Sequence, residues 1–338
     1  MITHFGLDIG SESIKIAQVE GEKNSFRLVT AGIVKTPVPS LALESDKDLV
    51  AVAEAIKKLK NEIKVASSQV VTALPERHIF TQMIEMPRMN PDELAQAIPW
   101  EAENIVPQPL TEINLDWEIV EDGESAKGNR MKVLLVAAPK ALIDKYMRVL
   151  KLAELEPLAL ETELLATVRC LNPIFNQGNL IIANLGLKSL DIAVIYRGSL
   201  FLTRSLPTAG EAITRALGTA LNLDLATAEE YKKTYGLSQQ AESKVASAIG
   251  PILAVIRDEI KKAIHFYTEK KQDPLRLLIL SGGSSLLPGL TEYFAQSLNL
   301  EVQVADPLAL IKVDEKSRQL LKSSSPLLTI ALGLAMKE

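Results

Sequence analysis

Residues 6–15, GLDIGSESIK, gather polar side chains that could bind a phosphate and a metal ion. Two apolar runs flank a bend that carries a carboxylate, a glycine, two hydroxyls and an amine: Asp8, Gly10, Ser11, Ser13 and Lys15. Backbone N–H groups exposed together at a tight bend form an anion-binding site, and a carboxylate beside phosphates can hold a hydrated Mg²⁺. The simpler alternative is a hairpin that Gly10 turns and Asp8 caps.

A second bend of the same kind lies in the middle of the chain. Residues 180–198, LIIANLGLKSLDIAVIYRG, again run from an apolar strand through a polar bend into another strand. An offset of 176 residues aligns Gly10 with Gly186, Ser13 with Ser189, Ile16 with Ile192 and Ala17 with Ala193. Such self-similarity is typical of a duplicated unit. It predicts a second phosphate-binding bend around Asn184 and Gly186.

Two further stretches have the composition of nucleotide-binding loops. Gly282 and Gly283 lie between an apolar strand and a helix, where a ligand could approach the backbone near the positive end of the helix. Gly210 opens another helix, and Glu229 and Lys232 lie three residues apart on one face of the helix that follows. These two residues are either a solvent-exposed pair or groups that hold a ribose and flank an adenine. The paired glycines alone are also a common turn.

The elements that must position these bends occur twice in the same order. Each hairpin is followed by another strand, by helical periodicity and by an apolar strand. We expect helices at 46–63, 210–223, 226–235 and 244–268, and closing strands at 70–75 and 275–283. A chain of 338 residues also exceeds the size of about 250–300 residues at which single cores stop growing. The pattern predicts two α/β lobes that face each other.

Residues 83–152 differ in character and interrupt the first lobe. They are rich in proline and contain a polar loop at 121–130. The expected elements are a helix from Pro91 with a capping box of Asn90 and Glu93, strands over 114–120 and 131–139, and a helix over 140–152. We also expect Pro99 to kink or divide the first of these helices. The segment predicts a small inserted α/β subdomain.

Composition excludes several classes of protein. The net charge of −5 and the lack of a Lys/Arg run argue against nucleic-acid binding. The longest apolar runs fall short of the ~20 residues that span a bilayer, and no secretory signal is visible. The single Cys170 excludes intrachain disulfides and cysteine metal clusters. We expect Cys170 to be buried in the protein core and the protein to lie in a reducing cytoplasm. We expect His4, His78 and His265 to be structural or solvent-facing.

Together these stretches resemble the actin-like ATPase superfamily, and within it the PilM family of type IV pilus assembly, with FtsA as its nearest cousin. The residues that carry the resemblance are GLDIGSESIK, NLG, LPTAGEAIT with AEEYKK, LSGGSSLLPGL and ALGLAM, in the family's order from residue 6 to 336. The resemblance implies an α/β protein with the actin-like ATPase fold: two duplicated lobes around a nucleotide cleft, with a small α/β subdomain inserted in the first lobe. It divides the chain into a first lobe at 1–82, 153–176 and 324–338, the inserted subdomain at 83–152, a second lobe at 177–210 and 274–323, and a helical subdomain of that lobe at 211–273.

The resemblance also implies a site for ATP and Mg²⁺. It assigns Asp8, Gly10, Ser11, Ser13 and Lys15 to the first phosphate loop, with Asp8 at the metal, and Asn184 and Gly186 to the second. It assigns Gly210, Glu229 and Lys232 to the ribose and base, and Gly282 and Gly283 to the adenosine loop. A connector helix over 158–171 makes Glu161 or Glu163 a candidate to orient water, although both could be solvent-facing helix carboxylates.

One residue departs from the family's pattern. Actin-like ATPases usually carry an aspartate at the position of Asn184, so a negative charge is absent there. A unit charge about 4 Å away is worth about 4 kcal/mol at an effective dielectric constant of ~20. We therefore expect ATP to bind but to turn over slowly, and to act as a ligand that stabilises lobe closure.

The resemblance implies a scaffold at the cytoplasmic face of the inner membrane. The inserted subdomain would help form a groove for the N-terminal cytoplasmic tail of a PilN-like membrane protein. Trp100, Ile98 and Ile105 would line that groove, unless they form the subdomain's own core. Membrane contact would come only through the partner, and a homo-oligomer is compatible with the superfamily. The alternatives are an FtsA-like division anchor, which would need an amphipathic tail after ALGLAM, and a small-molecule kinase, which would need a second acidic motif.

Overall fold

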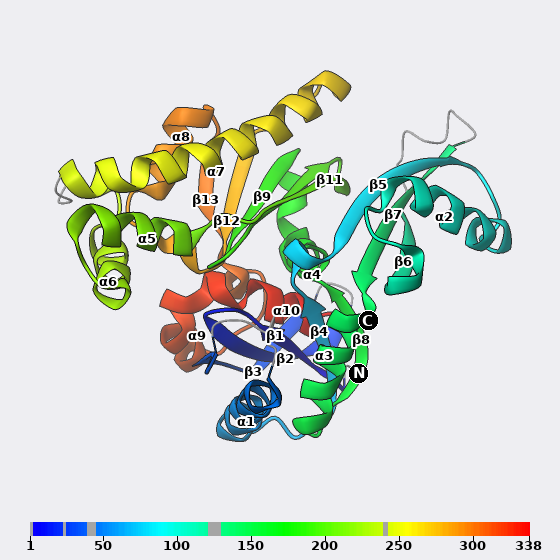
Figure 1. The fold of residues 1–338 in the computed structure, drawn as a ribbon, viewed down its shortest axis with the longest axis horizontal. Coiled ribbons are helices and arrows are strands. Elements are labelled where there is room, and N and C mark those ends of the chain that lie inside the picture. Colours follow the sequence, from blue (N-terminus) through cyan, green and yellow to red (C-terminus); the bar gives the residue numbers. More distant parts are fainter. Residues whose placement is uncertain (1–2, 23–24, 39–44, 121–129, 239–242) are drawn as a thin grey trace.

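The structure, a computed structural model, describes residues 3–22, 25–38, 45–120, 130–238 and 243–338. Two five-stranded sheets form separate lobes, one in the lower half and one in the upper half of Figure 1. A three-stranded sheet projects to the right of both lobes in the same view. The two lobes and the smaller inserted sheet are the arrangement that the sequence predicts.

The first lobe is built on a sheet with the strand order β3-β2-β1-β4-β8. Its strands are β1 (Phe5–Ile9), β2 (Ser13–Glu22), β3 (Ser25–Lys35), β4 (Gln69–Leu74) and β8 (Glu156–Thr162). β1 pairs antiparallel with β2 and parallel with β4, which in turn pairs parallel with β8. All five residues of β1 are buried because this central strand is covered on both faces.

Four helices cover the first sheet. α1 (Asp46–Glu62) and α3 (Lys140–Leu152) share one apolar core with β1. On the other face lie α4 (Glu163–Leu171) and α10 (Thr329–Ala335), and every residue of α10 is buried. Contact there is tight: a Cβ on Gly6 would lie 2.6 Å from the amide nitrogen of Ala335, and one on Gly333 would overlap the backbone of Ala166. Larger side chains at these two glycines would push α10 away from β1 and α4.

The second lobe repeats the first in topology. Its sheet has the order β11-β10-β9-β12-β13, with β9 (Leu180–Leu185), β10 (Leu190–Tyr196), β11 (Ser199–Leu206), β12 (Leu277–Ser281) and β13 (Glu301–Val304). An antiparallel meander is again followed by two parallel strands. The helices of this lobe are α5 (Gly210–Leu221), α6 (Leu225–Tyr235), α7 (Ser243–Lys270) and α8 (Leu290–Leu298). The duplication predicted from the 176-residue offset is therefore present in the fold.

The inserted unit is a small sheet with one helix. Its antiparallel strand order is β5-β7-β6, with β5 (Phe80–Pro87), β6 (Ile113–Val120) and β7 (Arg130–Pro139), and its helix is α2 (Pro91–Ile105). Asn90 and Glu93 form the predicted capping box. Pro99 does not divide α2, which runs through it without a break. Residues 121–129 of the expected polar loop lie outside the described residues.

Two segments pack differently from the expectation. The helix over 140–152 was expected to complete the inserted unit, but Tyr146, Val149 and Leu150 of this helix lie in the core of the first lobe. Residues before 324 also join the first lobe, because Leu308 packs with strands β2 and β3 and Lys312 hydrogen-bonds to β3 on both sides. The boundaries of the lobes at 152 and 323 therefore remain proposals, and packing favours moving both.

The connector between the lobes begins later than predicted. Residues 158–162 belong to strand β8, and α4 starts at Glu163 with the Thr162 hydroxyl as its N-cap. The rest of the chain contributes α9 (Glu315–Leu321) and the short 3₁₀ turns at 76–78, 110–112, 172–177, 283–286, 307–309 and 322–328. Cys170 is buried, as expected, and burial raises the pKa of its thiol to about 12. Among the helices described here, none combines the length and the apolar character needed to cross a bilayer.

Candidate nucleotide site

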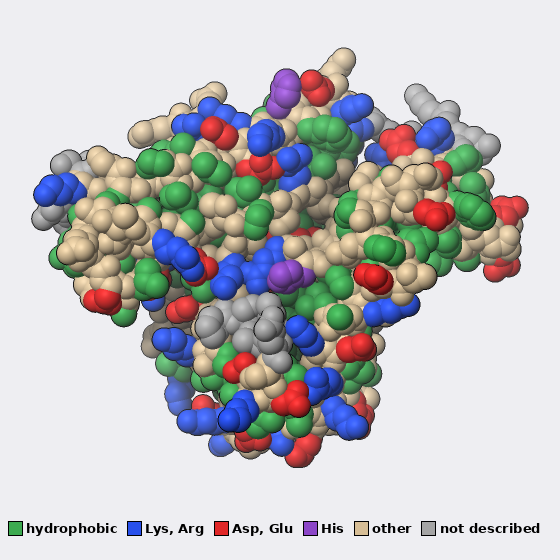
Figure 2. Space-filling model, viewed as in Figure 1, with side chains coloured by type: hydrophobic (Ala, Val, Ile, Leu, Met, Phe, Trp, Pro, Cys, Tyr) green, Lys and Arg blue, Asp and Glu red, His purple; other side chains and the backbone are tan. Residues whose placement is uncertain are grey.

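A cavity of about 410 Å³ lies between the two lobes and collects most of the predicted site residues. Those that line it are Asp8, Gly10, Ser11, Ser13, Lys15, Glu163, Asn184, Gly186, Glu229, Lys232, Gly282 and Gly283. Figure 2 shows Lys and Arg side chains gathered between the two lobes, with a His side chain beside them. Residues that are up to 275 positions apart in sequence therefore share one site, with Asp8 at one end of that span and Gly283 at the other.

The first hairpin presents its polar groups on opposed strands. Asp8 lies directly across from Lys15 in the β1–β2 register, and the Lys15 Nζ is 3.0 Å from the Asp8 Oδ2. The amide of Gly10 donates to the carbonyl of Ser13 at 3.1 Å, which closes the bend. A Cβ at Gly10 would lie 2.9 Å from the carbonyl oxygen of Ser13 and 2.8 Å from the Lys15 Nζ, so a side chain at this position would crowd the bend. The bend thus carries one buried carboxylate, one cation and an uncovered stretch of backbone.

The second hairpin repeats this geometry with different charges. The amide of Gly186 donates to the carbonyl of Ser189 at 3.0 Å, which is the counterpart of the Gly10–Ser13 bond. Asn184 lies across from Asp191 in the β9–β10 register. At the same offset of 176 residues, Asn184 corresponds to Asp8 and Asp191 corresponds to Lys15. The duplicated hairpins therefore carry Asp and Lys in one copy and Asn and Asp in the other.

Asp191 is a site residue that the sequence reasoning missed. Its carboxyl accepts hydrogen bonds from the hydroxyls of Ser205 at 2.6 Å and Ser189 at 3.0 Å. Burial raises its pKa to about 6, although these hydroxyl bonds oppose the shift. The second hairpin therefore does carry a carboxyl group, seven residues after the uncharged position 184. An acidic residue inside the apolar run LDIAVIY, aligned with Lys15, was the signal that could have revealed it.

The loop at Gly282 and Gly283, between β12 and α8, holds the second hairpin in place. Gly282 has a φ of +80°, and a Cβ there would lie 2.6 Å from the carbonyl oxygen of Leu185 and 2.7 Å from the Asn184 Oδ1. The Ser284 hydroxyl and the amide of Gly210 both donate to the carbonyl of Gly186, at 2.8 and 3.2 Å. Gly210 does not itself line the cavity, because it packs behind the bend. Its position is structural: it docks the first turn of α5 against the second hairpin.

Glu229 and Lys232 are not a solvent-exposed pair. Lys232 is 5% exposed, and its Nζ donates to the Glu229 carboxylate at 2.6 Å, the Thr214 hydroxyl at 2.9 Å and the Gly210 carbonyl at 3.2 Å. Burial lowers the pKa of Lys232, and the ion pair with Glu229 offsets part of that shift. Burial also raises the pKa of Glu229, but the bonds from Lys232 and Thr214 outweigh it and leave the pKa below its usual value. The pair ties α6 to α5 at the cavity wall.

Glu163 is the one predicted connector carboxylate that lines the cavity. It accepts a hydrogen bond from the amide of Glu76 at 3.3 Å, and burial together with the nearby Asp191 and Asp8 raises its pKa well above the usual value. Glu76 lies beside it, fully buried, and accepts from the amide of Leu164 at 3.4 Å. Burial raises the pKa of Glu76 to about 8. The sequence reasoning did not single out Glu76, because nothing in the run LPERH marks it as buried.

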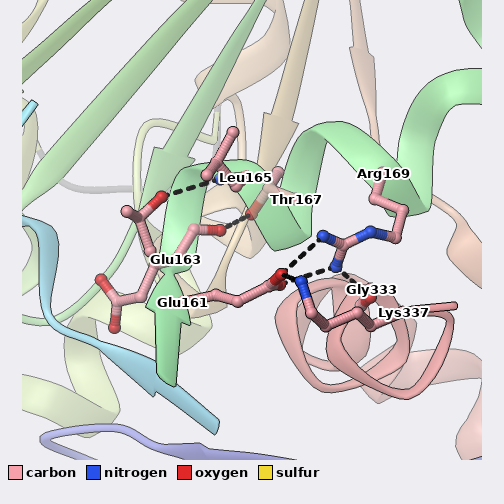
Figure 3. A network of polar contacts seen from close by, with 8 residues as sticks. Glu161, Glu163, Leu165, Thr167, Arg169, Gly333 and Lys337 are labelled. Carbon is pink, nitrogen blue, oxygen red and sulfur yellow. Dashed lines mark hydrogen bonds and ion pairs between the residues drawn. The ribbon is translucent and has the colours of Figure 1, made fainter. Parts of the chain in front are cut away.

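Glu161 does not line the cavity, and its side chain contacts other residues. Its carboxylate receives two bonds from the Arg169 guanidinium, at 2.8 and 2.9 Å, and one from the Lys337 amine, as Figure 3 shows. Arg169 also donates to the carbonyl of Gly333 at 2.8 Å. The prediction that Glu161 orients water in the cleft is therefore wrong: successive residues 161 and 163 at the β8–α4 junction serve different networks.

Further basic side chains at the cavity were not predicted. Arg77, His78 and Lys188 all line it. The Arg77 Nε lies 2.9 Å from the His78 Nε2, and burial followed by the Arg77 charge lowers the pKa of His78. His78 is therefore neither remote from the site nor simply solvent-facing. Basic side chains and two uncovered bends are features that favour the binding of phosphate groups.

The residues present fit a nucleoside triphosphate with Mg²⁺ better than a metal held by protein alone. Across the described ranges, no three His, Cys, Asp or Glu side chains converge on one point in the manner of a metal cage. Mg²⁺ is commonly held by one or two carboxylates together with waters and substrate phosphates. Asp8 can supply such a carboxylate. The neighbouring Gly10 has no side chain, whereas a Cβ there would close the approach that a phosphate needs.

Comparisons with known proteins point in the same direction. A family model described as type IV pilus assembly protein PilM matches residues 6–338. The solved PilM–PilN type IV pilus biogenesis complex is similar over 100% of this chain and 99% of the matched chain, with 27% identity and a TM-score of 0.89. The cell division protein FtsA of Streptococcus pneumoniae is 20% identical over 345 residues, which cover 89% of this chain and 75% of FtsA.

A more distant structure supports the fold alone. MreB5 of Spiroplasma citri bound to AMPPNP has 14% identity and a TM-score of 0.52 over 98% of this chain and 94% of its own. The predicted actin-like ATPase fold is confirmed by these likenesses together with the duplicated sheets.

Proposed function

The chain belongs to the family of type IV pilus assembly protein PilM, and on that premise we propose that it is an ATP-binding scaffold of a pilus assembly platform. The observation that carries the proposal is the cavity that both duplicated hairpins line, in a chain that matches the family from residue 6 to 338. The scaffold would work at the cytoplasmic face of the inner membrane and would reach the membrane through a partner. A division anchor of the FtsA type finds less support, because the FtsA likeness is distant.

Nucleotide binding is the first part of the proposal. The bends at Gly10 and Gly186 would receive the phosphates, with Lys15 as the neighbouring cation. Asp8 would hold Mg²⁺ through water, and the ion would supply charge neutralisation of the phosphates when bound. The ion pair of the buried Lys232 and the half-buried Glu229 would face the ribose and base. MreB5, which shares the fold, is solved with AMPPNP.

Slow turnover is the second part. Asn184 supplies no charge, and the Asp191 carboxyl is already engaged by two serine hydroxyls. Burial, followed by the nearby Asp191 and Asp8, raises the pKa of Glu163, which disfavours the ionised form that a general base needs. These features favour a nucleotide that stabilises one arrangement of the lobes over one that is rapidly consumed. The same features disfavour a small-molecule kinase, which needs an ionised base beside the transferred phosphate.

Partner binding is the third part. The solved PilM–PilN complex contains a chain similar to this one over its full length, and we propose that this chain likewise engages the N-terminal tail of a PilN-like membrane protein. Of the three groove candidates, Ile98 is buried in the core of the inserted unit and Ile105 packs partly against it. Trp100 is 73% exposed and remains available. Ile119 on β6, at one edge of the inserted sheet, is also exposed, so an extended tail could add to this strand.

A pull-down from membranes, with and without Mg-ATP, tests the proposal. Recovery of a PilN-like inner-membrane protein is expected from the wild type, and Trp100→Ala should reduce it. Leu320→Ala is the matched control, since Leu320 is equally exposed but lies on α9, outside the inserted unit. Equal recovery from both variants would remove Trp100 from the interface. Failure to recover any pilus protein, together with phosphorylation of a metabolite, would replace the scaffold with a kinase.

A further inference from the structure

Tyr146 is a cavity residue that no predicted role covers. It lies on α3 and lines the same cavity as Asp8 and Glu163, although only 1% of the residue is exposed. Its neighbours on the helix, Val149 and Leu150, are fully buried against α1 and β8 in the core of the first lobe. The ring is therefore fixed in place by packing, and the residue meets the cleft as part of a rigid wall.

The hydroxyl of Tyr146 has no hydrogen-bond partner among the residues that the structure describes. Within the described part of the chain it makes no hydrogen bond, whereas buried tyrosine hydroxyls usually have one. Burial, followed by the charges of Glu163 and Asp8, raises the pKa of this phenol well above 10. The group is therefore a protonated donor at every physiological pH. A donor without an acceptor at the wall of a cavity fits a ligand that brings an acceptor.

The position of Tyr146 indicates which part of a nucleotide that acceptor belongs to. Its charged neighbours are Glu163 on the connector, Asp8 on the first hairpin and Arg77 in the turn after β4. Glu229 and Lys232, which we assign to the ribose and base, are not among them. The structure assigns to Tyr146 a hydrogen bond to the terminal phosphate of a bound nucleoside triphosphate, which makes it a specificity-determining residue that distinguishes triphosphate from diphosphate. This assignment rests on the proposed function.

The same helix leads away from the cleft to the inserted unit. α3 follows directly from strand β7, and the Lys140 Nζ at its first residue donates to the carbonyl of Thr111, 2.8 Å away, just before β6. Residues 140 and 146 are separated by about 9 Å along a helix. A contact between Tyr146 and the terminal phosphate would therefore bear on the helix that supports the proposed partner-binding unit.

Calorimetry of the full chain with Mg²⁺ and either ADP or the non-hydrolysable analogue AMPPNP tests this inference. Tyr146→Phe removes the hydroxyl and keeps the ring, so the core is preserved. AMPPNP affinity is expected to fall about tenfold or more, as for loss of a hydrogen bond to a charged group, while ADP affinity stays within about twofold. Tyr293→Phe, on α8 and outside the cavity lining, is the matched control and should change neither affinity.

The possible results distinguish failure of the Tyr146 assignment from failure of the proposed ATP binding. If wild type binds both nucleotides and Tyr146→Phe keeps the same ratio of affinities, Tyr146 does not read the terminal phosphate and the proposed function stands. An equal loss for both nucleotides would show a structural role only and would overturn the inference. Wild type that binds neither nucleotide would remove the proposed ATP site, and this assignment with it.

Discussion

Glu76 and Glu163 each accept a hydrogen bond from the backbone beside the other. The amide of Glu76 donates to the Glu163 carboxyl at 3.3 Å, and the amide of Leu164 donates to the Glu76 carboxyl at 3.4 Å. The exchange joins the turn after β4 to the first turn of α4 at the wall of the cavity. Glu76 is buried, Glu163 faces the cavity and both have raised pKa values, so the protonation of this pair influences stability and chemistry together.

The free energy of unfolding should fall with rising pH because of Glu76. Its folded-state pKa of about 8 exceeds the ordinary 4.5, so its contribution is complete below about pH 4.5 and is lost as pH rises through about 8. A shift of this size corresponds to at most about 5 kcal/mol. Urea unfolding between pH 5 and 9 should show wild type losing stability relative to Glu76→Gln, which cannot ionise. Parallel pH profiles for the two proteins would contradict this.

ATP hydrolysis should be slow at neutral pH and should accelerate as pH rises. Its rate is expected below the ~1–100 s⁻¹ of kinases, and ionisation of Glu163 would supply the missing general base. Phosphate release measured across pH should be flat for Glu163→Gln. Glu161→Gln, which alters a carboxyl outside the cavity, is the control and should keep the wild-type slope. An ATP hydrolysis rate above about 1 s⁻¹ at pH 7 would contradict the prediction.

Lys232 should matter far more for stability than its neighbour Lys233. Lys232→Ala removes a buried cation with three acceptors and takes from the half-buried Glu229 its shortest ion pair, at a cost of ~2–4 kcal/mol. The Lys233 side chain is mostly exposed and lies 3.4 Å from Glu229, so Lys233→Ala should cost at most about 0.5 kcal/mol. Urea denaturation compares the two. Similar losses would mean that Lys232 is less buried than described.

Gly282→Ala should destabilise the protein and weaken nucleotide binding. The residue would be strained at its positive φ, and its Cβ would collide with the Leu185 carbonyl and the Asn184 side chain, for ~2 kcal/mol or more. Gly250→Ala, inside α7 with open space around it, should instead stabilise by ~0.5–1 kcal/mol. Thermal unfolding and calorimetry with Mg-AMPPNP measure both effects. A neutral Gly282→Ala would show that the loop relaxes freely.

Features that depend on residues close together in the chain were predicted well from the sequence. The two bends, the duplicated order and the capping box of α2 each depend on residues close together in the chain, so spacing alone revealed them. The bends also carried most of the site, because Asp8, Gly10 and Gly186 lie on the hairpins themselves.

Long-range packing was the part that spacing could not predict. The amphipathic pattern of 140–152 gives a helix but not the surface it covers, and this surface belongs to the first lobe rather than the insertion. Glu161 and Glu163 are both glutamates and lie two residues apart. Glu161 nevertheless forms ion pairs with Arg169 and Lys337, whereas Glu163 lines the cavity. Asp191 and Glu76 were missed for the same reason: burial of a charge depends on what closes over it.

The last helix of the fold closes a core that begins with the first strand. Gly6 of β1 packs against α10, and residues 329–335 are buried between β1 and α4. During synthesis, that side of the first sheet must stay bare until these residues have left the ribosome. The hairpin that carries Asp8 therefore matures late, and an N-terminal fragment without residues 329–335 should leave that face of the first sheet uncovered.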